Sequence, residues 1–202
     1  PNTFRRLFAE GSFNSAFVPQ YSKLDIKKKA FEFANSVFNL LIFFLLVLVC
    51  VAEIFMSGVI YIISPGFIEN AEKYNLAVTL SRIAFPFLLF VSLSSFYSAI
   101  LNTKGRFAVA AAAPIILNLL LIASIFYAKF FDKELVYFMA WAVTLAGILQ
   151  LIMLAIYAKK YFVPKISFNF KISPEVKHFF KRLLPSIFSS GVTQINILVG
   201  TV

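Results

Sequence analysis

The sequence predicts an all-α, polytopic transmembrane helical bundle. Its residues are 60% hydrophobic and only 14% charged, whereas a soluble globular domain usually carries about 25% charged residues. Five segments contain no charged residue. Each is about 20 residues long, which is the length that a helix needs to cross a bilayer. These segments are residues 33–52, 83–103, 107–128, 135–158 and 183–202. Open β-structure is excluded, because lipid cannot satisfy the backbone groups at its edges.

The first element, residues 1–22, is predicted to be the end of a helix that lines a cavity. Its first three turns are amphipathic, with one polar and one apolar face. The polar face holds Asn2, Arg5, Arg6 and Glu10, and the apolar face holds Phe4, Leu7, Phe8 and Gly11. The pattern breaks after Gly11, because Phe13 and Phe17 fall on the polar side.

The remaining elements are predicted to be helices separated by turn signals. We expect them over residues 31–63, 74–103, 107–128 and 135–160, with the start of a further span at 183–202. At about 1.5 Å per residue, the helix 31–63 would be roughly 50 Å long. It is therefore expected to tilt or to end outside the hydrocarbon. The turn signals are Ser64-Pro65-Gly66, Lys104-Gly105-Arg106 and a basic stretch around Pro164.

The distribution of Lys and Arg predicts the orientation in the membrane. The connections 23–30, 104–106 and 159–182 hold thirteen of the sixteen connection cations, and 64–74 and 129–134 hold the other three. Basic connections tend to stay in the cytoplasm. The first three connections are therefore expected inside and the other two outside, so that residues 1–22 run inward. The net charge of +10 is explained by this orientation and does not indicate nucleic-acid binding.

The usual signatures of enzyme or metal chemistry do not occur in the sequence. Cys50 is the single cysteine and His178 the single histidine, so neither a Cys/His metal site nor a cofactor is expected. No nucleophile–base pair, carboxylate dyad or phosphate-binding glycine loop is found. The serines Ser92, Ser94 and Ser95 are interpreted as helix-packing groups. Glu53 and Arg82, at the outer ends of their helices, are interpreted as charges that reach the headgroups.

The polar face of residues 1–22 is the candidate binding site. Charges at membrane depth normally line a cavity or pair with one another. Arg6 and Glu10 are four residues apart and could pair on a helix surface, which leaves Arg5 available for an anion. Its planar guanidinium suits phosphate or pyrophosphate. An ion pair that only fixes the depth of the helix remains the alternative.

The string Pro1-Asn2-Thr3-Phe4-Arg5-Arg6-Leu7-Phe8-Ala9-Glu10-Gly11-Ser12-Phe13 resembles the signature of the MurJ (MviN) family of lipid II flippases in the MOP exporter superfamily. Weaker similarities follow in the same order over nearly the whole chain. They include Pro65-Gly66-Phe67, Phe85-Pro86, Ala99-Ile100-Leu101-Asn102-Thr103, Ala113-Pro114, Trp141-Ala142-Val143 and Gln194-Ile195.

The resemblance implies a longer, two-lobed transporter in the bacterial inner (cytoplasmic) membrane, of which this chain is an internal fragment. Its substrate would be the undecaprenyl-linked peptidoglycan precursor, lipid II. The resemblance gives Arg5 a role in substrate binding, and Asn2, Arg6 and Glu10 belong to the same motif. Alternating access would carry the precursor to the outer leaflet.

Three other functions remain open at this stage. The nearest is another exporter of the same superfamily, for O-antigen or capsule oligosaccharides, although the Arg-Arg-Leu-Phe-Ala-Glu-Gly string argues for the peptidoglycan branch. A membrane-embedded enzyme would need clustered acidic or basic catalytic residues. A non-catalytic membrane subunit would place Arg5 against lipid and not in a cavity.

Overall fold

The computed structural model describes residues 12–24, 26–67, 69–131, 134–167, 172–183 and 185, and these residues contain helices without a strand. The elements are α2 (Ser12–Ser22), α3 (Lys27–Ile54), α4 (Met56–Ile63), the 3₁₀ turn η1 (Pro65–Phe67), α5 (Ala71–Ala84), α6 (Phe87–Thr103), α7 (Phe107–Phe130) and α8 (Leu135–Ala158). A further helix covers 174–183. The predicted all-α bundle is confirmed.

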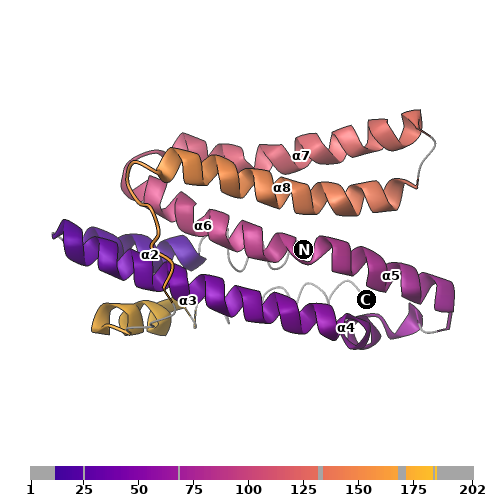
Figure 1. The fold of residues 1–202 in the computed structure, drawn as a ribbon, viewed down its shortest axis with the longest axis horizontal. Helices are drawn as coiled ribbons and strands as arrows, with labels where there is room; N and C mark the ends of the chain where they lie inside the picture. Colours follow the sequence, from indigo (N-terminus) through magenta and orange to yellow (C-terminus); the bar gives the residue numbers. More distant parts are fainter. Residues whose placement is uncertain are drawn as a thin grey trace.

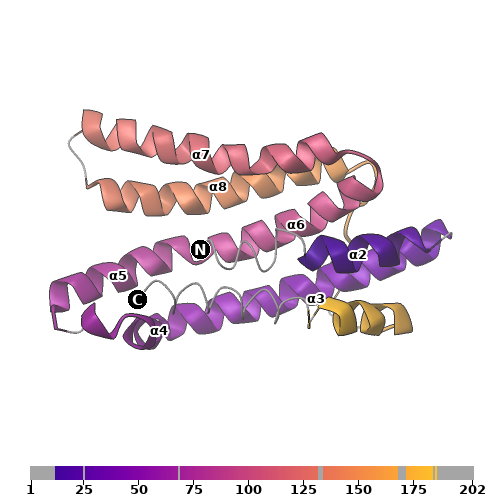
Figure 2. The same cartoon turned by 180° about the vertical axis from the view of Figure 1, so that it is seen from behind.

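Four stretches of the described chain are long and apolar enough to cross a membrane: Lys27–Ile54, Ala71–Thr103, Phe107–Phe130 and Leu135–Ala158. The predicted span 183–202 lies almost entirely outside the described residues. Figure 1 shows α7 and α8 as a pair on one side, the α5–α6 line in the middle, and α3 with α2 on the other side. Figure 2 shows the same order from behind.

The connections of the four stretches fall at two opposite ends of the bundle. One end holds the α2–α3 turn, the α6–α7 link and the exit of α8, while the other holds the α4–α5 and α7–α8 turns (Figure 1). The predicted orientation assigns the same connections to the same two sides of the membrane. We call the first the basic end, because the Lys-rich connections lie there.

The long helix predicted over 31–63 is divided at Phe55 into α3 and α4, so the prediction of a single helix is wrong. Figure 1 shows α4 turned out of the line of α3. The turn coincides with a contact from another helix: the Tyr74 hydroxyl of α5 donates to the Ser57 carbonyl at 2.7 Å, and Met56 is almost fully buried. A side chain that binds a helix carbonyl is a common origin of a kink.

The stretch Ala71–Thr103 bends at Pro86, between α5 and α6. Proline has no N–H to continue the helical ladder. Nearby, the carbonyl of Ile83 accepts a hydrogen bond from the Thr144 hydroxyl of α8. The bend is therefore held from outside by α8, as membrane helices require when a backbone carbonyl loses its usual partner.

Gly147 lets α8 approach α6 closely beside this bend. A Cβ at this position would lie 2.8 Å from Phe87 Cδ2 and 3.0 Å from Phe90 Cβ. Small residues have this function at many membrane helix interfaces, because backbones can then pack closely.

Candidate functional site

The predicted binding residues Asn2, Arg5, Arg6 and Glu10 lie outside the described residues. The structure describes the same helix region from Ser12 onward. What it shows is how the segment that directly follows the motif is held in the bundle.

Two phenylalanines anchor α2. Phe13 and Phe17 are 2% and 0% exposed, and their rings stack with centroids 5.4 Å apart. The ring of Phe17 also meets Phe33 of α3 at 5.5 Å and Phe96 of α6 at 5.4 Å. Their position on the predicted polar face is thus explained, because this side of α2 is packed inside the bundle.

The helix 174–183 joins the same aromatic cluster. Phe179 is fully buried, with ring centroids 5.5 Å from Phe13 and 6.1 Å from Phe17. Edge-to-face pairs of this kind each contribute about 0.5–1.5 kcal/mol beyond burial. The cluster of Phe13, Phe17, Phe33, Phe96 and Phe179 therefore ties α2 to three other elements at the basic end.

Two amide side chains add a polar tie between α2 and α6. The Asn102 side-chain amide donates to the Asn14 side-chain oxygen at 3.3 Å. Asn102 lies in the last turn of α6, so this contact links α2 to the end of that helix.

A pair of asparagines on α3 holds the segment that follows α8. Asn35 Nδ2 donates to the carbonyl of Lys165 at 3.0 Å, and its Oδ1 accepts from the N–H of Lys165 at 2.7 Å. Asn39 Nδ2 donates to the same carbonyl at 3.0 Å, and its Oδ1 accepts from the N–H of Ser167 at 3.2 Å. Lys165 Nζ also lies 5.9 Å from the ring centroid of Phe31. We call residues 163–167 the strap.

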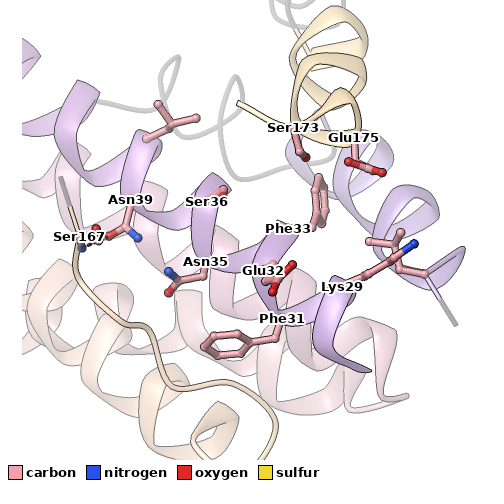
Figure 3. A pocket seen from close by; sticks show the side chains of 12 residues that line it. Lys29, Phe31, Glu32, Phe33, Asn35, Ser36, Asn39, Ser167, Ser173 and Glu175 are labelled. Carbon is pink, nitrogen blue, oxygen red and sulfur yellow. Dashed lines mark hydrogen bonds between the residues drawn. The ribbon is translucent and has the colours of Figure 1, made fainter. Parts of the chain in front are cut away.

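A cavity of about 540 Å³ opens between the strap, the helix 174–183 and the first half of α3 (Figure 3). Lys29, Glu32 and Glu175 bring charges to its wall. A hydrogen bond with Ser173 lowers the pKa of the Glu175 carboxyl, with help from its own backbone N–H and from the positive charge of Lys29. Ser173 also accepts a hydrogen bond from the N–H of Val176 at 3.4 Å, so it caps this helix.

Charges and buried hydroxyls elsewhere in the bundle were predicted to have structural roles. The Glu53 oxygen Oε1 is buried and lacks a hydrogen-bond partner among the described residues, with Arg82 as a charged neighbour. The structure thus brings together two residues that no local sequence pattern pairs. Ser92 and Ser94 are buried between helices, and Ser95 donates to the Val91 carbonyl at 2.9 Å. Within the described residues no group of three or more His, Cys, Asp or Glu side chains comes together.

The asparagine pair was missed in the sequence, although it left a signal. Asn35 and Asn39 are four residues apart in a segment that is otherwise largely apolar, so they share one helix face. Their partner lies more than a hundred residues along the chain, and helical periodicity contains no information about such a partner.

Together, four membrane-length helical stretches, a proline-bent helix braced by its neighbour and a polar cavity at the basic end define a polytopic helical membrane protein. Comparison with known proteins gives the particular family. Residues 1–202 match the family model described as lipid II flippase MurJ, and the chain belongs to this family.

Relatives and a solved structure agree with this assignment. The chain is 38% identical to the probable lipid II flippase MurJ of Rhizobium tropici, over 99% of the chain and 39% of the relative. It is 35% identical to the lipid II flippase MurJ of Burkholderia cenocepacia, over 100% and 40%. A structure described as lipid II flippase MurJ in an inward closed conformation superposes with a TM-score of 0.76 at 28% identity, over 97% of this chain and 40% of that one. The chain thus spans about 40% of the length of these relatives.

Proposed function

We propose that this chain is part of the first lobe of a flippase that moves lipid II from the inner to the outer leaflet of the bacterial inner membrane. The observation that carries the proposal is the family match over residues 1–202, which includes the Arg5-Arg6 motif. The activity is transport by alternating access, not catalysis. The names of the relatives favour lipid II over the lipid-linked oligosaccharides of other exporters.

In this proposal Arg5 contacts the pyrophosphate of the substrate from a water-filled cavity. An arginine at membrane depth is costly unless it is solvated or paired. Arg6 and Glu10 are four residues apart and could pair on a helix surface, and Asn2 belongs to the same motif. The planar guanidinium of Arg5 then remains for bidentate contact with phosphate oxygens.

The described structure supports the proposal through the anchoring of α2. The aromatic cluster fixes α2 against α3, α6 and the helix 174–183. The strap fixes the connection that leads to this last helix. A binding motif that directly precedes α2 in the chain would therefore move together with the basic end of the lobe when the two lobes rock against each other.

The test is complementation of a flippase-depleted bacterium with the full-length protein that carries this chain. A charge-assisted contact contributes about 1.5–3 kcal/mol, so Arg5→Ala should weaken substrate binding by about one to two powers of ten and abolish or severely reduce growth. Arg5→Lys should rescue only in part, because it keeps the charge but loses the planar fork.

Lys73→Ala is the matched control, because it removes an exposed cation at the opposite end of the bundle. Protein level in the membrane is measured in parallel for all variants. Full growth with Arg5→Ala at normal protein level would refute the binding role of Arg5.

A further inference from the structure

Four cations lie at neighbouring helix ends: Lys104 and Arg106 stand in the link between α6 and α7, and Lys159 and Lys160 directly follow α8. We call these four residues the basic rim. Tyr161 follows Lys160. A hydrogen bond with Arg106 lowers the pKa of its phenol, and the positive charges of Lys160, Arg106 and Lys104 act in the same direction. Lys160 Nζ lies 5.5 Å from the centroid of this ring. Arg106 and Lys160, from two helix ends, thus both act on Tyr161, whereas Lys104 Nζ lies 5.6 Å from the ring centroid of Tyr21 on α2.

The backbone of the α6–α7 link places two rim residues. The N–H of Arg106 donates to the Leu101 carbonyl at 3.0 Å, and the N–H of Gly105 donates to the Asn102 carbonyl at 3.1 Å. Gly105 has φ +67°. These are the two hydrogen bonds and the left-handed residue of a Schellman helix end. The link is therefore a defined turn, and it fixes where Lys104 and Arg106 leave the backbone.

An apolar groove of about 400 Å³ lies between α7 and α8. It is lined by Ile116, Leu149, Ile152, Met153, Ile156 and Tyr157. At about 1.5 Å per residue, the rise along a helix from Ile156 to the rim at Lys160 is about 6 Å, and from Leu149 to Ile156 about 10 Å. A phosphate at the rim could thus place the first half of an acyl chain in the groove.

The charge of the rim selects the kind of lipid. The segments 101–106 and 156–162 contain four cations and not a single Asp or Glu. A zwitterionic headgroup would bring its own ammonium into this positive field, whereas an anionic headgroup brings only negative charge. Basic pockets between transmembrane helices on the cytoplasmic side are suited to anionic lipid headgroups.

We propose that the basic rim and the α7–α8 groove form a binding site for an anionic glycerophospholipid of the cytoplasmic leaflet. Arg106 and Lys160 contact the phosphate, and one acyl chain lies along the groove. This site is separate from the Arg5 motif and does not depend on the proposed transport activity.

The experiment uses the full-length protein in nanodiscs of phosphatidylcholine that contain a minor fraction of phosphatidylglycerol. Lipids retained by the protein are counted by native mass spectrometry. The double variant Arg106→Gln/Lys160→Gln should lose the preference for phosphatidylglycerol by about ten- to thirtyfold, since each cation near a phosphate contributes about 1 kcal/mol. The matched control Lys73→Gln/Lys129→Gln removes two exposed cations from the opposite end and should keep the preference.

Two further variants keep the test independent of folding. Arg106→Lys/Lys160→Arg preserves the charge and should retain the preference. Ile152→Trp fills the groove and should reduce retained phosphatidylglycerol while the rim stays intact. An equal loss in the control variant, or no preference in the wild-type protein, would overturn the proposal. Retention of undecaprenyl pyrophosphate in place of phosphatidylglycerol at the rim would overturn it as well.

Discussion

Gly147 makes the most quantitative prediction about how the bundle is packed. In Gly147→Ala the new methyl group would lie 2.8 Å from Phe87 Cδ2 and 3.0 Å from Phe90 Cβ, where the optimum between carbon atoms is about 3.5–4.0 Å. Either the Phe87 ring rotates or α8 moves away from α6. Overpacking of this kind typically costs about 1–3 kcal/mol, and the better helix propensity of alanine returns up to about 1 kcal/mol. We therefore expect Gly147→Ala to lower the free energy of unfolding by about 1–2 kcal/mol.

The matched control is Gly58→Ala on α4, where an added Cβ meets nothing within 4 Å. This substitution should be neutral or slightly stabilising, for the same reason of helix propensity. Thermal unfolding of the purified full-length protein in one detergent measures both variants. Gly147→Ala should melt several degrees below the wild type, and the added substitution Phe87→Leu should restore part of the loss. Equal melting temperatures for the two alanine variants would refute the close approach of α8 to α6.

Three further predictions concern the ends of the bundle. Asn39→Ala removes two hydrogen bonds to the strap, so it should lower the free energy of unfolding by about 1–3 kcal/mol and speed hydrogen exchange in the strap. Unchanged hydrogen exchange would contradict this prediction. Cysteines at Ser22 and Glu69, with the native cysteine removed, should label from opposite sides of the membrane with an impermeant reagent; equal labelling would overturn the orientation. The contacts that lower the pKa of the Glu175 carboxyl also stabilise the folded state at neutral pH. This contribution is lost as the pH falls through the folded-state pKa. Acid should therefore loosen the helix 174–183, and Ser173→Ala should weaken that pH dependence when hydrogen exchange is measured against pH.

The sequence was sufficient to predict the fold class and, within two residues, the limits of α7 and α8, because these depend on local properties. Charge-free segments of membrane length indicated the spans. The Ser64-Pro65-Gly66 and Lys104-Gly105-Arg106 segments were expected as turns, and the structure has turns at both. Proline removes a backbone donor and glycine adopts a left-handed conformation at little cost, so both act within a few residues.

The features that sequence reasoning missed depend on tertiary contacts. The break at Phe55 has no proline or glycine at the position itself, and it coincides with a hydrogen bond from Tyr74 on another helix. The strap depends on asparagines and backbone groups that are distant in sequence. Glu53 and Arg82 were interpreted separately because nothing local joins them. The motif residues Asn2, Arg5, Arg6 and Glu10 lie outside the described residues, so their roles remain predictions.

The central claim is that the protein containing this chain moves lipid II across the membrane and uses Arg5 to do so. The most direct measurement follows radiolabelled lipid II in flippase-depleted cells that express the full-length protein. An enzyme that cleaves lipid II is added outside, and the fraction of the precursor that becomes accessible is determined. We predict that the wild-type protein makes most of the precursor accessible and that Arg5→Ala, at the same protein level, leaves it protected. Equal accessibility with the wild-type protein and Arg5→Ala would contradict the role of Arg5, and protection in both would contradict the proposed function itself.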